Sequence, residues 1–269
     1  MTKPQRFLKE PAIAAEIVAR FRAANKAPET SYATVRDYCE SVDHLPQITG
    51  LDGDLKNVQR PWAVKALLRC VPPPARILEI GGGEPIVSGF LNELGYDVTL
   101  VDPYDGFGNG PTEYERYVEA FPNVKIVRAY LEPRMQAFAA NSFDAIFSVS
   151  VLEHLPWDAA ANAFRAIGEF LAPGGASIHC FDFVLQGIAQ EYDLTSARHL
   201  LALQNQLQNR EGETGFDELL ERLKGDLETF YLSPQGHHSW RGGLPYEKFP
   251  FRKVVSLQTI AFRPNDNSP

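Results

Sequence analysis

Five short apolar runs, separated by stretches of helical character, dominate the middle of the chain. The runs occupy residues 77–80, 98–101, 124–127, 143–149 and 176–183. Helices are predicted between them, at residues 86–94, 112–121 and 157–171. Strands that are covered on both faces read as continuous apolar runs, whereas strands with one wet face alternate between apolar and polar residues. The pattern therefore predicts an α/β domain built on a mainly parallel sheet.

The flanking segments are expected to extend this domain. Residues 1–71 contain amphipathic stretches and are followed by three consecutive prolines, so we expect a helical lid or extension there. Residues 72–263 form the main domain, in which residues 184–228 carry leucines at helical spacing and are expected to be a helical insertion before strand six. The last two strands are predicted at residues 229–233 and 253–262. Residues 264–269 are expected to form a polar tail.

The charge and composition of the chain limit its partners. Thirty-four acidic against twenty-six basic side chains give a formal net charge of −8 at pH 7, and no basic cluster offsets it, which argues against nucleic acid. The three cysteines lack metal-ligand spacing and indicate reduced thiols. Neither a signal peptide nor a run of about eighteen apolar residues is found, which argues against export and against a membrane span. We therefore expect a cytoplasmic protein whose partner is a small molecule.

A glycine-rich turn follows the first strand. Residues 77–85 read ILEIGGGEP, so Gly81, Gly82 and Gly83 stand between the strand and the next helix. The missing side chains and free main-chain N–H groups of such a turn let a nucleotide approach closely. A dinucleotide fingerprint counted from Gly81 requires a further glycine at the position of Ile86. The turn thus predicts a nucleotide-like ligand and disfavours a dinucleotide.

The residues of this turn resemble the first motif of the class I S-adenosylmethionine-dependent methyltransferases. In that family an acidic residue precedes alternating glycines, with proline tolerated last, and the chain matches this with Glu79, Gly81, Gly83 and Pro85. Asp102 ends the second strand, where the family uses a carboxylate to bind both ribose hydroxyls. A carboxylate can accept both of these hydrogen bonds.

Further matches to the same family follow in its order along the chain. They include Leu-Glu-His within residues 151–155 and the turn at residues 171–175. The resemblance covers roughly residues 75–183. It implies one bound S-adenosylmethionine and a Rossmann-like sheet of seven mostly parallel strands, the last pair antiparallel. It assigns the cofactor contacts to Glu79, Gly81, Gly82, Gly83, Asp102, Pro103, Tyr130, Leu131 and Ser148.

Three histidines follow strand ends, where ligands of open parallel sheets bind. Removing the proton of an acceptor hydroxyl near neutral pH suits a histidine. His238 is the first candidate for this base, His237 the second and His154 the third. Each of them can instead serve only to hold a loop by hydrogen bonds, and His154 in particular can brace the loop beside the cofactor.

Other residues on the substrate side have two interpretations each. Asp182 can bind an acceptor hydroxyl or orient the base, or it can cap a helix. Trp240 and Arg241 can form a stacking and anion-pairing wall for the substrate, or Trp240 can plug its loop onto the sheet. Adjacent histidines such as His237 and His238 rarely share an ion without a third spaced ligand, so no metal is expected.

These features together predict a methyltransferase that uses S-adenosylmethionine and acts on a small molecule, with O-methylation assisted by a histidine base as the leading interpretation. N- or C-methylation of a small molecule remains an alternative, and so does a non-catalytic scaffold or regulatory protein that keeps the fold. A homo-oligomer is possible. The sequence does not name the acceptor.

Overall fold

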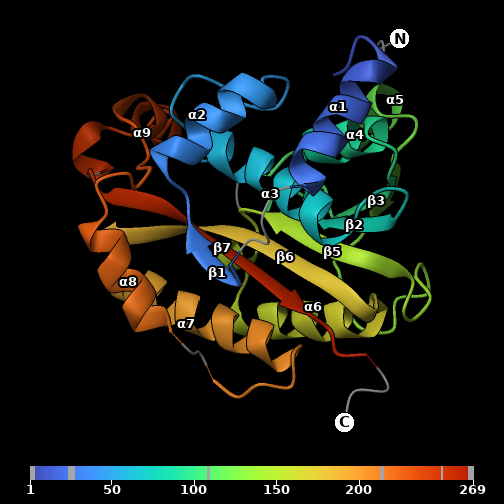
Figure 1. Cartoon of the computed structure of the whole chain (residues 1–269). Helices are drawn as coiled ribbons and strands as arrows, with labels where there is room; N and C mark the ends of the chain where they lie inside the picture. The colour runs from blue at the N-terminus through green and yellow to red at the C-terminus, as the bar shows by residue number, and fades with distance from the viewer. Residues whose placement is uncertain (1–3, 24–27, 108–109, 213–214, 250, 266–269) are drawn as a thin grey trace.

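A seven-stranded sheet in the order β1–β7–β6–β5–β2–β3–β4 forms the centre of the protein (Figure 1). The computed structural model describes residues 4–23, 28–107, 110–212, 215–249 and 251–265. The strands are β1 (Thr30–Tyr32), β2 (Arg76–Ile80), β3 (Asp97–Asp102), β4 (Lys125–Arg128), β5 (Phe143–Val149), β6 (Leu171–Gln186) and β7 (Lys253–Phe262). Strands β2 to β6 pair in parallel, and β7 is antiparallel to both of its neighbours. The predicted Rossmann-like sheet and its antiparallel final strand are confirmed.

Helices cover both faces of this sheet. They are α1 (Pro11–Arg22), α2 (Val35–His44), α3 (Lys56–Cys70), α4 (Ile86–Glu93), α5 (Tyr114–Ala120), α6 (Trp157–Phe170), α7 (Gln190–Gln206), α8 (Phe216–Gly225) and α9 (Pro234–Arg241), with short 3-10 helices η2 (Leu152–His154) and η3 (Tyr246–Lys248). Figure 1 shows α6 and α7 on one face and α1, α3 and α4 on the other. Helix α6 buries one apolar stripe, as its helical spacing in the sequence predicts, whereas α3 is buried on most of its sides.

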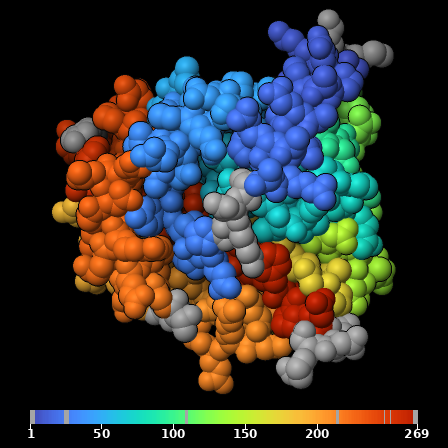
Figure 2. All heavy atoms as spheres, viewed as in Figure 1, coloured from blue at the N-terminus to red at the C-terminus, as the bar shows by residue number. Residues whose placement is uncertain are grey.

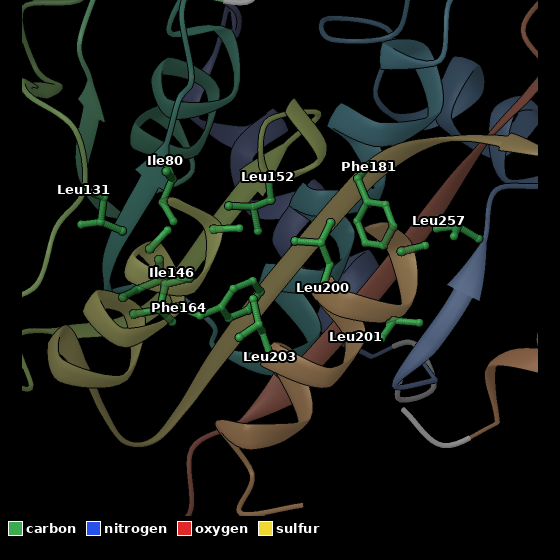
Figure 3. Packing of buried hydrophobic residues seen from close by; sticks show 14 of the residues in the cluster. Ile80, Leu131, Ile146, Leu152, Phe164, Phe181, Leu200, Leu201, Leu203 and Leu257 are labelled. Atoms are coloured by element: carbon green, nitrogen blue, oxygen red, sulfur yellow. The ribbon is translucent and has the colours of Figure 1, made fainter. Parts of the chain in front are cut away.

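The core on the α6–α7 side joins three elements. Figure 3 shows Ile146 of β5 and Phe181 of β6 packed with Phe164 of α6 and with Leu200 and Leu203 of α7. All five side chains are buried. Because α7 comes from residues 184–228, this part of the predicted insertion contributes to the main core and also fixes the carboxyl end of β6.

The strand at the far edge of the sheet differs from the prediction. Residues 229–233 form single bridges to Thr34 and Val255 and do not form a strand, so that prediction is wrong. Pro234 begins α9 and the Ser233 hydroxyl accepts a hydrogen bond from the Gly236 N–H, which turns the chain into a helix. The edge position is taken by β1, which pairs antiparallel with β7.

The segment before β2 packs closely on the sheet. In α3, Ala63, Val64 and Leu67 are fully buried, and this helix contacts β5 and β6. Figure 2 shows α1 and α2, in blue, over a broad area of the surface. The domain boundary at residue 71 and a lid role for this segment stay predictions. Of the predicted tail at residues 264–269, residues 266–269 lie outside the described part.

No helix in the described part of the chain combines the length and the apolar character that crossing a bilayer requires.

Candidate functional site

A cavity of about 770 Å³ opens at the carboxyl ends of β2, β3, β5 and β6. This is the edge of a parallel sheet at which ligands bind. Eight of the nine residues predicted to contact the cofactor line this cavity: Glu79, Gly81, Gly82, Gly83, Asp102, Pro103, Tyr130 and Leu131. The ninth, Ser148, is buried and its hydroxyl lies 2.8 Å from His179 Nδ1. Ser148 therefore faces the interior of the sheet, and a cofactor role for it stays a prediction.

The glycine-rich turn brings the main chain to the cavity wall. Gly81 has a φ of +63°, and a Cβ atom there would lie 2.6 Å from Val151 Cγ1. At Gly82 a Cβ atom would lie 2.5 Å from Leu100 Cδ1. Distances this short require the backbone or the neighbouring side chains to move. Only glycine fits the turn as it is folded, and the cavity is open beside it.

Glu79 holds the turn in place through hydrogen bonds to the helix that follows it. Its carboxylate accepts hydrogen bonds from the Ser88 N–H at 3.1 Å and from the Ser88 hydroxyl, which ties the end of β2 to the first turns of α4. Burial raises the pKa of Glu79 to about 7, although the Ser88 hydrogen bonds act in the opposite direction. The side chain also lines the cavity, so it can both hold the turn and contact a ligand.

Asp102 connects the end of β3 to the same turn. Its Oδ2 accepts a hydrogen bond from the Gly83 N–H at 3.0 Å, and its Oδ1 accepts one from the Tyr104 N–H at 2.8 Å. The Tyr104 hydroxyl in turn donates to the Gly83 carbonyl oxygen at 2.8 Å. Burial raises the pKa of Asp102, and the two N–H donors lower it. The carboxylate is thereby fixed on the cavity wall.

The wall beyond Asp102 is formed by the end of β4. Tyr130 is half exposed and its hydroxyl donates to Asp105, whereas Leu131 is buried. An aromatic ring and an aliphatic side chain can enclose a flat heterocycle between them.

The structure separates the three candidate histidines. His154, in η2 after β5, lines the cavity. His237 and His238 lie in α9 and are not among the lining residues. The His237 ring nitrogens lie 3.0 Å from the Ser233 carbonyl oxygen and 2.7 Å from the Arg252 carbonyl oxygen, and its ring stacks on Phe251. His237 is thus placed to hold α9 against the start of β7, and a catalytic role for His237 or His238 stays a prediction.

Asp182 also lies on the cavity wall, within β6. Its Oδ1 accepts a hydrogen bond from Gln59 Nε2 at 2.8 Å, and its Oδ2 accepts one from the Ser150 hydroxyl at 3.0 Å. These contacts show no helix-capping role for Asp182. Burial raises the pKa of the side chain, while Lys56 is the largest of the effects that lower it.

Glu153 is a neighbour of Asp182 that the sequence does not single out. It belongs to η2, and its Oε1 accepts a hydrogen bond from the Asp182 N–H at 2.8 Å. Burial raises the pKa of Glu153 to about 8, and the nearby Asp182 charge acts in the same direction. The Leu-Glu-His sequence contains Glu153, but only its histidine was interpreted as a functional residue.

Of the two other predicted substrate residues, Trp240 and Arg241, only the first lines the cavity. Trp240 lines the cavity, and its indole N–H donates to Asp54 Oδ2 at 2.6 Å, which fixes the ring against the loop before α3. Arg241 is not among the lining residues; its Nη2 lies 3.4 Å from His238 Nδ1. A substrate role for either residue stays a prediction, and only Trp240 is in place for it.

Cations from α3 complete the wall. Lys56 and Arg60 both line the cavity, one helical turn apart, and neither forms an ion pair within the described part of the chain. Burial lowers the pKa of Arg60, and Glu79 and Glu84 act against this effect. The i, i+4 spacing of the two residues was visible in the sequence, but nothing there indicated which face of α3 meets the sheet.

Comparison with known proteins fits this geometry. The model of a family described as "Methyltransferase domain" matches residues 54–223, more than half of the chain. The chain belongs to this family. Membership confirms that the chain carries the predicted methyltransferase domain.

Individual relatives are more distant. The chain is 32% identical over 123 residues to the uncharacterized protein Rv1509 of Mycobacterium tuberculosis, a match covering 45% of this chain and 39% of that protein. It is 34% identical over 101 residues to a ubiquinone biosynthesis O-methyltransferase of Nitrosococcus oceani, covering 37% of this chain and 40% of the relative. These matches span about two fifths of the length of each relative.

A solved structure resembles most of the chain. It is that of a putative sarcosine dimethylglycine methyltransferase from Galdieria sulphuraria, at 15% identity and a TM-score of 0.48, covering 86% of this chain and 99% of that protein.

Proposed function

We propose that this methyltransferase transfers the methyl group of S-adenosylmethionine to a hydroxyl of a small molecule. One observation carries the proposal: two walls face the same cavity. The first wall contains the glycine-rich turn and Asp102, and the second contains Lys56, His154 and Asp182. The volume of about 770 Å³ lies within the range of roughly 300–1,000 Å³ that is typical of small-molecule sites. The formal net charge of −8 argues against nucleic acid as the acceptor.

The residues on the first wall fit the cofactor. Asp102 can accept hydrogen bonds from the two ribose hydroxyls, and Tyr130 and Leu131 can enclose the adenine. The turn from Gly81 to Gly83 leaves room for the chain between ribose and sulfur. Arg60, which forms no ion pair with a described residue, offers a cation for the carboxylate of the methionine part. When bound, S-adenosylmethionine supplies a methyl group already activated by its sulfonium charge.

The second wall would hold the acceptor. In the transfer the acceptor oxygen forms a bond to the methyl carbon, the carbon–sulfur bond breaks with its electron pair going to sulfur, and the hydroxyl proton must leave. Catalysis therefore depends mainly on positioning the two reactants and on removing this proton. We assign assistance in proton removal to His154, the one candidate histidine that lines the cavity.

Calorimetry and an acceptor screen test the proposal. Titration with S-adenosylmethionine and with S-adenosylhomocysteine should give one site per chain; if neither binds tighter than about a millimolar, roughly 4 kcal/mol, the cofactor assignment fails. The protein is next incubated with methyl-labelled cofactor and a metabolite extract, and the labelled products are examined by mass spectrometry and NMR for a new O-methyl group. Label on nitrogen or carbon would contradict O-methylation.

A matched pair of variants tests the role of His154. His154→Ala should lower kcat while leaving the affinity for S-adenosylhomocysteine within about twofold. His44→Ala, at a residue that does not line the cavity, should change neither. An unchanged kcat in His154→Ala would remove this residue from the proposal. A cytoplasmic location and a possible homo-oligomer stay predictions from the sequence.

A further inference from the structure

Three potential metal ligands meet beside the acceptor wall. Glu153, His154 and Asp182 each offer one ligand atom, and these atoms lie within 4.8 Å of one another. The register of the sheet brings them together, because β5 and β6 pair in parallel up to Val149 and Cys180. Glu153 and His154 lie in η2, which follows β5, and Asp182 lies in β6 two residues after Cys180. The neighbouring strands thus place a histidine and two carboxylates at one point.

Glu153 leaves a buried oxygen without a partner. Its side chain is 9% exposed; Oε1 accepts the Asp182 N–H, but Oε2 is buried and has no hydrogen-bond partner among the described residues. An unpaired carboxylate oxygen in the interior is costly. Lys56 lines the adjoining cavity but forms no ion pair with Glu153 or with any other described residue. A metal ion at this position would give Glu153 Oε2 the partner that the described residues do not supply.

Asp182 is held in the orientation that a ligand requires. Gln59 Nε2 and the Ser150 hydroxyl donate to its two oxygens, as outer hydrogen-bond partners of metal-binding carboxylates do. Each carboxylate oxygen has two lone pairs, so both oxygens keep one for an ion.

We propose that Glu153, His154 and Asp182 bind one divalent cation. A histidine nitrogen with two carboxylate oxygens is a ligand set suited to Zn²⁺ or Mn²⁺. Metal–ligand bonds of about 2.0–2.2 Å at tetrahedral angles place ligand atoms about 3.3–3.6 Å apart. The three donors lie within 4.8 Å of one another, so they need to close by up to about an ångström. His154 is half exposed and can make this movement.

The site would be open toward the acceptor. His154 and Asp182 line the cavity of about 770 Å³, and all three ligands line an adjoining hollow of about 270 Å³. Three protein ligands with an open position are typical of catalytic metal sites. Resting on the proposed O-methylation, the ion would bind the acceptor hydroxyl and lower its pKa, and His154 would assist proton loss as a ligand of that ion.

Metal binding is tested on the full chain without any methyl acceptor. Chelator-treated protein is titrated with Zn²⁺ and with Mn²⁺ by calorimetry; one ion per chain is expected for at least one metal. Glu153→Gln and Asp182→Asn should each weaken binding by at least about tenfold, whereas Glu132→Gln, a carboxylate on the opposite part of the cavity wall, should bind as the wild type does. Circular dichroism checks that each variant is folded.

A crystallographic readout is independent of the variants. Wild-type crystals grown with Zn²⁺ should give an anomalous peak between the three side chains. No saturable binding of either metal, an anomalous peak elsewhere, or equal affinity in the wild type and both folded ligand variants would overturn the site. Because S-adenosylmethionine binding and methyl transfer are measured separately, failure of the metal site and failure of the proposed function give different results.

Discussion

The Asp102 carboxylate accepts a hydrogen bond from the Gly83 N–H at 3.0 Å. This contact joins the end of β3 to the glycine-rich turn after β2. A second hydrogen bond, from the Tyr104 hydroxyl to the Gly83 carbonyl oxygen, joins the same two segments. One side chain therefore both shapes the turn and faces the cavity. A ligand that bound Asp102 would meet a carboxylate whose position is already fixed, which reduces the ordering cost of binding.

Substitution of Asp102 should weaken cofactor binding. Hydrogen bonds to a charged group contribute about 1.5–3 kcal/mol each, so we expect Asp102→Ala to raise the Kd for S-adenosylhomocysteine at least about tenfold in calorimetry. Asp97→Ala is the matched control, because Asp97 is exposed at the opposite end of the same strand. Equal affinities in the two variants would contradict a ribose-binding role for Asp102.

A methyl group added to the turn should unfold it locally. In Gly81→Ala the new Cβ meets Val151, and the positive φ adds a cost of about 1–2 kcal/mol. We expect the free energy of unfolding in urea to fall by more than about 2 kcal/mol. Gly243→Ala, whose Cβ meets no atom within 4 Å and whose φ is not positive, should change it by less than about 0.5 kcal/mol. Similar values for the two variants would show that the turn is not as tightly packed as described.

The fold could be predicted from sequence wherever local pattern and burial agree. Strands β5 and β7 begin and end at the predicted residues, since each is a mostly apolar stretch flanked by polar residues. The edge strand was missed because β1 is only three residues long and is defined by its pairing with β7, a contact more than 220 residues distant in the chain. Long-range pairing of this kind leaves no local signal.

The residues of the site also fall into those that a local motif predicts and those that only packing brings together. The turn and Asp102 carry a local motif and were found, whereas Lys56 and Arg60 reach the cavity only because α3 docks on β5 and β6. From the sequence His238 is the first candidate for the base and His154 the third, yet α9 places His238 off the cavity wall. Which side chains converge on a site depends on packing between elements, and packing is what a single sequence shows least.

The ionisation of Glu79 should make the ligand-free protein less stable at high pH. Burial raises the pKa of Glu79 to about 7 from the ordinary value of 4.5. The folded state therefore holds this proton more tightly than the unfolded chain does. This group leaves the free energy of unfolding unchanged below about pH 4.5, lowers it progressively from pH 4.5 to about 7, and lowers it fully above that, by roughly 3 kcal/mol.

Glu79→Gln isolates this effect. Glutamine keeps an oxygen that can accept the Ser88 N–H but cannot ionise, so the variant should be more stable than the wild type at pH 8 and close to it at pH 5. Urea unfolding at the two pH values measures the difference, and all other titrating groups are common to both proteins. A gain that is equal at pH 5 and pH 8 would show that Glu79 is not the group responsible.

Arg60 should account for recognition of the cofactor carboxylate. Its guanidinium lies on the cavity wall, forms no ion pair with a described residue and interacts electrostatically with Glu79, which precedes the glycine-rich turn. The wild type is therefore expected to bind S-adenosylmethionine about tenfold or more tightly than decarboxylated S-adenosylmethionine, as the loss of a charge-assisted hydrogen bond requires. Arg60→Gln should weaken binding of S-adenosylmethionine and leave binding of the decarboxylated compound nearly unchanged, so that the ratio of the two dissociation constants approaches one.

Arg69→Gln is the matched control. Arg69 lies near the other end of α3 and not on the cavity wall, so this variant should keep the wild-type ratio. A ratio that survives in Arg60→Gln would mean that another residue, such as Lys56, binds the carboxylate.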